Sequence, residues 1–214
     1  MEIELPVVSS EHAQPGRPRD PQLENRVKAA AIEVFGASGW AGFTLDAVAR
    51  RAGVGKGSLY LRWADKEELL LDALDALDAR IGILTATDTG EARSDLVELV
   101  LQFLRLYAGP HGPAALRLGT ELRGVKGIEA HFDAMRTSQV NAARAIVRRG
   151  VARGQLPKKT PVTLLLDTLC GGAMIHAMVS PEVIDAGSPA ARRYADQLVD
   201  FVLGAVVPPG EVRS

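Results

Sequence analysis

The sequence predicts an all-α protein of about nine helices, and two features of the chain indicate this fold class. Ala, Leu and Val dominate its hydrophobic residues, which make up 47% of the chain, whereas aromatic residues make up only 5%. This balance favours closely packed helices over a β-sandwich. Apolar residues also recur at the three- and four-residue spacing of one helix face, and no segment reads convincingly as a strand.

The first two helices are bounded by residues that commonly start or stop a helix. Pro21 suits the first turn of a helix that Gly36 and Gly39 are expected to end. Thr44 is a good N-cap for the second helix, and Gly53 is expected to close it in a left-handed conformation. These residues predict one longer helix that starts near Pro21 and one shorter helix that follows it.

Polar, glycine and proline breaks separate the seven helices expected after these two. Each expected helix carries apolar residues on at least one side, and no internal repeat of 20–50 residues is visible. We expect these helices over residues 56–63, 65–84, 92–108, 113–123, 125–153, 160–179 and 188–207.

Cysteine usage and hydropathy indicate the compartment. The single cysteine, Cys170, rules out an internal disulfide framework and fits a reducing cytoplasm. No apolar run approaches the roughly 20 residues that span a membrane. Residues 1–14 are acidic and lack the basic and apolar regions of a secretory signal. We therefore expect a cytoplasmic protein without membrane contact.

The net charge of −1 hides an uneven distribution. Residues 15–66 hold nine Lys and Arg against five Asp and Glu, an excess of four positive charges. The remainder holds 16 against 21, an excess of five negative charges. A basic segment on an acidic body is typical of a DNA-binding head joined to a partner or ligand domain. The excess is modest, so it supports a DNA-binding motif without establishing one.

Residues 44–63 read as a helix-turn-helix motif: a short helix, a glycine-marked turn and a second short, basic helix. A major groove is about 12 Å wide and admits one helix, whose tip must be small so that its backbone can approach. Gly55 and Gly57 meet that need. Leu59 and Trp63 are spaced i and i+4, and we expect them to hold the reading helix on its partner helix.

Polar residues in and beside this motif are the candidate DNA contacts. Lys56 supplies charge for a phosphate, and Ser58 and Tyr60 can bond phosphates or base edges. Lys66 starts the following helix, whose free N–H groups favour a phosphate. The predicted DNA-binding residues are Thr44, Lys56, Gly57, Ser58, Tyr60, Arg62 and Lys66, with Arg17 and Arg19 on an arm that reaches a minor groove. Alternatively, the motif residues form a solvated helix face, and Arg17 and Arg19 belong to a disordered tail without a DNA contact.

The motif and its surroundings closely resemble the tetracycline-repressor (TetR) family. The resemblance is carried by TLDAVARRAGVGKGSLYLRW at 44–63, DKEELL at 65–70 and AAIEVFGASGW at 30–40, and it is specific over roughly residues 21–80. It implies an all-α homodimer with a three-helix DNA head, a helical body that binds a small molecule, and dimerisation through the last two helices. Trp63 departs from the more usual phenylalanine, and Gly55 stands where a serine would offer a phosphate contact.

This resemblance divides the chain into four expected segments. They are a disordered N-terminal arm over 1–20, a helix-turn-helix domain over 21–66, a helical ligand-binding and dimerisation domain over 67–207, and a tail over 208–214. One short recognition helix reads few base pairs, so a two-fold dimer doubles the site. Apolar stripes on the last two helices predict that interface at Leu165, Leu169, Ala173, Tyr194, Leu198, Phe201, Val202 and Ala205, with ordinary intrachain core as the alternative.

The middle helices are expected to enclose the ligand pocket. Its candidate lining residues are Phe103, Tyr107, His111, Glu121, Phe132, Met135, Gln139, Cys170 and Met174, although apolar residues of this kind are more often ordinary core. The scattered histidines match no zinc motif, and Cys170 reads as a buried structural thiol. No nucleophile–base pair, phosphate-binding loop or paired-acid motif is visible, so we expect no catalysis, no cofactor and no metal.

These features predict a ligand-released repressor that binds a palindromic double-stranded DNA operator as a homodimer. A largely apolar pocket favours a hydrophobic effector. An activator is a further alternative, because operator position relative to the promoter decides the sign of regulation. The alternative of a different class is a helical small-molecule-binding protein or enzyme with a vestigial DNA head.

Overall fold

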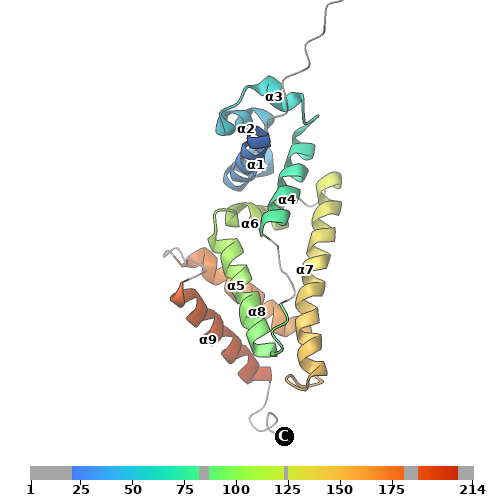
Figure 1. Ribbon diagram of the computed structural model, residues 1–214, viewed down its shortest axis with the longest axis vertical. Coiled ribbons are helices and arrows are strands. Elements are labelled where there is room, and N and C mark those ends of the chain that lie inside the picture. The colour runs from blue at the N-terminus through green and yellow to red at the C-terminus, as the bar shows by residue number, and fades with distance from the viewer. Residues whose placement is uncertain (1–20, 82–86, 123–124, 181–187, 207–214) are drawn as a thin grey trace, which may run out of the picture.

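The computed structural model describes residues 21–81, 87–122, 125–180 and 188–206, and over these ranges it contains nine α-helices and no strand (Figure 1). The all-α prediction is confirmed. The arm over 1–20, with Arg17 and Arg19, and the tail over 208–214 lie outside the described residues. The helices are α1 (Pro21–Gly42), α2 (Leu45–Ala52), α3 (Lys56–Tyr60), α4 (Lys66–Ile81), α5 (Ala92–Ala108), α6 (Gly112–Glu121), α7 (Lys126–Ala152), α8 (Val162–Val179) and α9 (Pro189–Val206).

The first helix extends further than predicted. It continues past Gly36 to Gly42, and Gly39 interrupts it with φ 66° and ψ −175°, which produces a kink. This backbone conformation favours glycine, and a Cβ at Gly39 would lie 2.3 Å from Glu121 Oε2, so a side chain here would also displace that carboxylate. The expected helix end is therefore a kink.

The third helix is shorter than the predicted 56–63, because α3 ends at Tyr60. The N–H groups of Arg62 and Trp63 both donate to the Leu59 carbonyl, at 2.8 and 2.9 Å. Two donors converging on one acceptor mark a tightened turn in place of a further helical turn. This turn carries Trp63 away from the α3 axis and toward α4.

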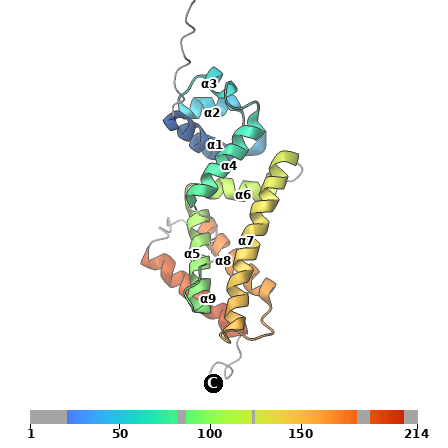
Figure 2. The same ribbon diagram turned by 45° about the vertical axis from the view of Figure 1, so that its right-hand side comes forward.

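The helices form a head and a body, with α4 leading from one to the other in both views (Figures 1 and 2). One apolar cluster lies within α1–α4 and includes Phe35, Leu59 and Leu69, all fully buried. It also takes in Leu118 of α6 and Ile128 of α7, so elements late in the chain complete the core of the head. The body therefore contacts the head directly as well as through α4.

The second cluster is built around α5, which packs against α8 and α9. Leu96 and Leu104 of α5 are fully buried, as is Val199 of α9. Asp95, also fully buried, accepts hydrogen bonds at Oδ1 from the N–H and hydroxyl of Thr89, both at 2.7 Å. Its Oδ2 accepts no hydrogen bond within the described residues and lies 3.8 Å from Arg149 Nη2.

This packing corrects four of the predicted dimer contacts. Leu165, Leu169, Ala173 and Val202 belong to the intrachain core and are at most 5% exposed. Side chains buried within the chain cannot also contact a partner, so these four predicted residues lie on the inner side of their helices. The outward apolar residues of the two helices are Leu164, Ile175, Met178, Val179 and Phe201, which are 49–77% exposed. Phe201, at 77% exposed, is a predicted contact that does lie on the outer side.

The described part of α8 is long and apolar enough to cross a membrane by length and composition. The sequence prediction of no such run was therefore too strict. Leu165 and Leu169 nevertheless pack into the body core, with Ala173 beside them. One apolar side of α8 is therefore buried in the body, and its other apolar side is exposed.

Candidate DNA-binding site

Local hydrogen bonds fix both ends of α2 as predicted. Thr44 Oγ1 accepts from the Ala47 N–H at 3.1 Å, which caps the helix start. Gly53 has φ 67° and ψ 38°, and the following Val54 N–H bonds the Ala49 carbonyl at 3.0 Å. The turn between α2 and α3 is therefore defined by a left-handed glycine cap. In this structure Thr44 serves as the cap, and its predicted DNA contact stays a prediction.

The reading helix presents one apolar and one exposed side. Leu59 is fully buried and Trp63 is 3% exposed, so both anchor α3 and its following turn on the head core as predicted. Tyr60 is 57% exposed and Leu61 is 87% exposed. Leu61 was not among the predicted contacts, because an apolar residue in this pattern reads as core. Its exposure beside Tyr60 adds it to the candidate DNA-facing surface.

Gly55, which precedes α3, and Gly57, within it, have no intrachain reason to be glycine. A Cβ added at Gly55 or Gly57 would meet nothing within 4 Å, and Gly55 has an ordinary φ of −69°. The fold thus tolerates a side chain at both positions. Absence of side chains at an exposed helix tip is consistent with close approach by another molecule, as a DNA backbone would require.

The two candidate phosphate-binding lysines have partners in the free protein. Lys56 forms an ion pair with Asp46 of α2, and its side chain is 59% exposed. Lys66 Nζ donates to the Trp40 carbonyl at 3.0 Å and lies 3.8 Å from the centre of the Trp40 ring. Both ammonium groups are at the head surface, and DNA phosphates would compete with these partners.

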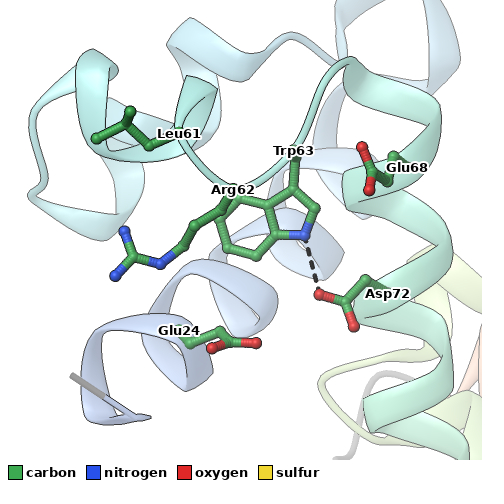
Figure 3. A pocket seen from close by; sticks show the side chains of 6 residues that line it. All are labelled: Glu24, Leu61, Arg62, Trp63, Glu68 and Asp72. Carbon is green, nitrogen blue, oxygen red and sulfur yellow. Dashed lines mark hydrogen bonds between the residues drawn. The ribbon is translucent and has the colours of Figure 1, made fainter. Parts of the chain in front are cut away.

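Trp63 is tied to α4 and α1 through a polar network beside a recess of about 400 Å³ (Figure 3). Its indole N–H donates to Asp72 Oδ2 at 2.9 Å, and Asp72 Oδ1 lies 2.8 Å from Lys28 Nζ. Lys28 also pairs with Glu24 at 3.2 Å. Burial alone would lower the pKa of Lys28, but its bonds to both carboxylates raise it. The network holds the end of the reading unit against two helices of the head.

Arg62 lines the same recess on the α1 side of Trp63 (Figure 3). Its Nη1 donates to the backbone carbonyl of Ser58 at 3.1 Å, four residues earlier in the motif. The contact reaches across one turn and helps to fix the short α3. The roles predicted for both residues in reading DNA remain predictions.

The head is fastened to the body where α6 meets the end of α1. Glu121 accepts from the Trp40 N–H at 2.9 Å, and Arg117 Nε donates to the Gly36 carbonyl at the same distance. Glu121 and Arg117 also pair with each other along α6. The Trp40 N–H, and then Arg117, hold the pKa of Glu121 below its usual range. Glu121 was predicted in the ligand pocket, but its carboxylate is directed at the head.

The body contains a cavity of about 360 Å³ between α5, α7 and α8. Phe103, Gln139 and Cys170, three of the predicted pocket residues, line it. Burial, with a further effect from Asp167, raises the pKa of the Cys170 thiol to about 12. The thiol is therefore neutral at physiological pH, in agreement with its reading as a structural cysteine.

The other predicted pocket residues surround this cavity or lie elsewhere. The Tyr107 ring is 6.0 Å from that of Phe103, and burial raises the pKa of its phenol. Phe132 lines a separate recess of about 280 Å³. Three further predicted residues do not line the 360 Å³ cavity. His111 precedes α6, and Met135 and Met174 are half-buried on α7 and α8.

Sequence reasoning missed the remaining lining residues of the cavity. They are Arg136, Val140, Ala143, Arg144, Thr163, Leu166 and Asp167. Arg136, Val140 and Arg144 are spaced four residues apart, and this spacing alone predicts that they share one face of a helix. Within the described ranges, no group of three or more His, Cys, Asp or Glu side chains is placed to hold a metal ion.

A capped helix, a left-handed glycine turn and a short anchored helix with an exposed outer side define a helix-turn-helix DNA-binding protein. Residues 28–73 match the family model described as bacterial regulatory proteins, tetR family, and residues 86–202 match the tetracyclin repressor-like C-terminal domain. The chain belongs to the TetR family of helix-turn-helix transcriptional regulators.

Individual relatives agree with this assignment. The chain is 30% identical over 186 residues to the DNA-binding transcriptional repressor TetR of Mycobacteroides abscessus, covering 85% of this chain and 92% of that protein. It is 29% identical to the regulator AqdR of Rhodococcus erythropolis, covering 79% and 81% of the two chains.

Solved structures share the fold. The repressor MexZ of Pseudomonas aeruginosa aligns with a TM-score of 0.68 at 20% identity, covering 86% of this chain and 96% of that chain. FadR of Bacillus subtilis, solved with stearoyl-CoA, aligns with a TM-score of 0.64 at 18% identity, covering 85% and 98%.

Proposed function

We propose that this regulator is a cytoplasmic homodimeric repressor that binds a palindromic operator through α3 and is released by a small-molecule effector in the body. The exposed outer side of α3 is the observation that carries the proposal. Tyr60 is exposed beside Gly57, whose missing side chain leaves open space, while Leu59 fixes the helix from behind. This arrangement presents backbone and polar groups to a groove without loosening the head.

Release by an effector is supported by the cavity in the body and by the link from α6 to the head. Relatives named as repressors include the Mycobacteroides abscessus TetR and MexZ, and FadR was crystallised with an acyl-CoA. An effector that prefers one arrangement of the body over another changes DNA affinity by linkage. The segments 21–66 and 67–207 are proposed as the DNA-binding and effector-binding parts.

Dimerisation is proposed through the outward apolar sides of α8 and α9. Phe201 is 77% exposed, Leu164 is 65% exposed and Ala205 is also exposed. Glycines without close neighbours lie on the same helices, at Gly171 and Gly204, and permit close helix approach. The predicted contacts Tyr194 and Leu198 are half-buried and border this surface. Apolar patches of this kind on a soluble protein mark interfaces.

Selection from a pool of random duplexes tests the DNA-binding part of the proposal. The full-length protein is expected to enrich a palindrome whose half-sites are centred about one helical turn, or 34–36 Å, apart. Enrichment of no sequence, or of a single half-site without a symmetric partner, would contradict it.

A matched pair of substitutions tests the dimer. Phe201→Glu is expected to yield a folded monomer in sedimentation equilibrium, because it places a charge in the proposed interface. Lys158→Glu, which also places a negative charge at an exposed position but lies outside α8 and α9, is expected to leave the dimer intact. A dimeric Phe201→Glu protein would place the interface elsewhere.

A further inference from the structure

The body cavity between α5, α7 and α8 has an apolar floor and a charged rim. The floor residues are Phe103, Ala143, Leu166 and Cys170, of which Ala143 and Leu166 are buried. The neutral thiol and the absence of charge among these side chains suit an apolar ligand surface. The volume of about 360 Å³ is near the lower end of small-molecule sites, which span about 300–1,000 Å³.

The rim is dominated by one face of α7. Arg136, Val140 and Arg144 follow one another at four-residue spacing and all line the cavity. Val140 is 38% exposed, so an apolar side chain lies uncovered between two guanidinium groups. At a rise of about 1.5 Å per residue, the Cα atoms of the two arginines are roughly 12 Å apart along the helix.

The two arginines differ in their partners. Arg136 pairs with Asp133 on the same helix at 3.2 Å. The guanidinium of Arg144 forms no ion pair or hydrogen bond with any residue in the described part of the chain. Asp167 is the single carboxylate among the residues that line the cavity. The lining therefore carries two positive charges and one negative charge, with one guanidinium available.

We propose that this cavity binds a small amphipathic anion. A carboxylate, sulfonate or phosphate group pairs with Arg144, and the apolar part lies against Val140, Leu166 and Phe103. The inference rests on the proposed function, in which the body binds an effector, and it names the chemical class of that effector. It also narrows the hydrophobic ligand predicted from the sequence to one with an anionic head.

Desolvation decides between ligand charges. An apolar body that fills the cavity removes water from the guanidinium of Arg144. A neutral hydroxyl offers this group a single uncharged acceptor, which leaves its other donors unpaired. A cation adds positive charge beside two arginines. An anion supplies acceptors in the fork geometry that arginine binds best.

Titration calorimetry on the free, full-length protein with octanoate, octanol and octylammonium tests the proposal. The three probes share one apolar chain and differ in the charge of the head. We expect octanoate to bind most tightly, and Arg144→Gln to weaken its binding by about tenfold or more. The matched control is Arg148→Gln, because Arg148 is exposed one turn further along α7 and does not line the cavity.

Charge reversal provides a second arm. Arg144→Glu is expected to abolish octanoate binding and to strengthen octylammonium binding, which simple loss of folding would not produce. Equal affinities for octanoate and octanol, indifference of octanoate to both Arg144 variants, or no binding of any probe would overturn the proposal. Operator selection contains no ligand, so a failure of DNA binding and a failure of anion binding are told apart.

Discussion

Glu121 Oε2 on α6 accepts a hydrogen bond of 2.9 Å from the backbone N–H of Trp40 at the end of α1. The carbonyl of the same Trp40 accepts from Lys66 Nζ at 3.0 Å, and its ring lies under that ammonium. One residue of the head is thus bonded to the body and to the start of α4. Trp40 therefore connects α6 to the lysine predicted to hold a DNA phosphate.

The carboxylate of Glu121 makes this junction sensitive to acid. Its folded-state pKa is lowered, so its contribution to stability is complete above its ordinary pKa of 4.5 and is lost as the pH falls through the lowered value. Glu121→Gln is expected to reduce the free energy of unfolding at pH 7 and to flatten its decline below about pH 5. Urea unfolding over a pH series measures both.

The control for this variant is Glu129→Gln on α7, because the Glu129 side chain makes no hydrogen bond or ion pair with the residues that the structure describes. It is expected to retain the acid dependence of the unaltered protein. If the free energy of unfolding of Glu121→Gln fell with acid as steeply as that of the unaltered protein, this carboxylate would not support the junction.

The Trp63–Asp72 hydrogen bond is expected to stabilise the head measurably. Trp63→Phe keeps an aromatic ring in a site that is 3% exposed and removes the N–H donor, so a loss of about 1–2 kcal/mol is expected. A double-mutant cycle with Asp72→Ala should give a coupling energy of about 1 kcal/mol by denaturant unfolding. Strict additivity would mean that the bond contributes nothing beyond packing.

Gly57 and Gly53 should respond in opposite ways to alanine. Gly57→Ala adds a methyl group to open space on a helix, so stability should be unchanged or rise by up to about 1 kcal/mol. Operator affinity should nevertheless fall by roughly tenfold, because the methyl group keeps the α3 backbone from DNA. Gly53→Ala should cost about 1–2 kcal/mol, since φ is 67° there. Unfolding and fluorescence-anisotropy titrations separate the effects, and full affinity in Gly57→Ala would contradict the close approach.

Cys170 should react slowly with thiol reagents in the native protein. Burial and Asp167 raise its pKa to about 12, so the thiolate is scarce at pH 8. Disulfide-exchange reagents should modify the native protein far more slowly than the urea-unfolded protein, in which the pKa returns to an ordinary value. Equal rates in the two states would contradict a buried thiol and would reopen redox sensing as a role.

The sequence predicted best where the structure is determined locally. Thr44 and Gly53 act within one or two turns of their own position, so their capping roles followed from residue type. Leu59 and Trp63 were assigned to the core because a four-residue spacing places both on one face. The predicted end of the third helix, at residue 63, was wrong. Two N–H groups converge on the Leu59 carbonyl, and apolar periodicity does not predict this turn geometry.

Contacts between distant segments were beyond the sequence pattern. Glu121 was assigned to a pocket because it is a polar residue in a middle helix, but its partner Trp40 lies 81 residues earlier. Leu165 was assigned to the dimer interface, whereas its neighbour Leu164 is the exposed residue, because both faces of α8 are apolar. Composition cannot tell an internal apolar face from an external one. Only the packing of α5 and α9 against α8 resolves it.

The double substitution Tyr60→Ala with Lys66→Ala tests the central claim most directly. Anisotropy titration on the selected palindrome should show loss of operator binding, while sedimentation shows a folded dimer. The matched control, Lys158→Ala with Lys159→Ala, removes two exposed charges from the body and should bind normally. Operator binding of unchanged affinity in a folded Tyr60→Ala, Lys66→Ala dimer would contradict the assignment of residues 44–66 as the DNA-reading surface.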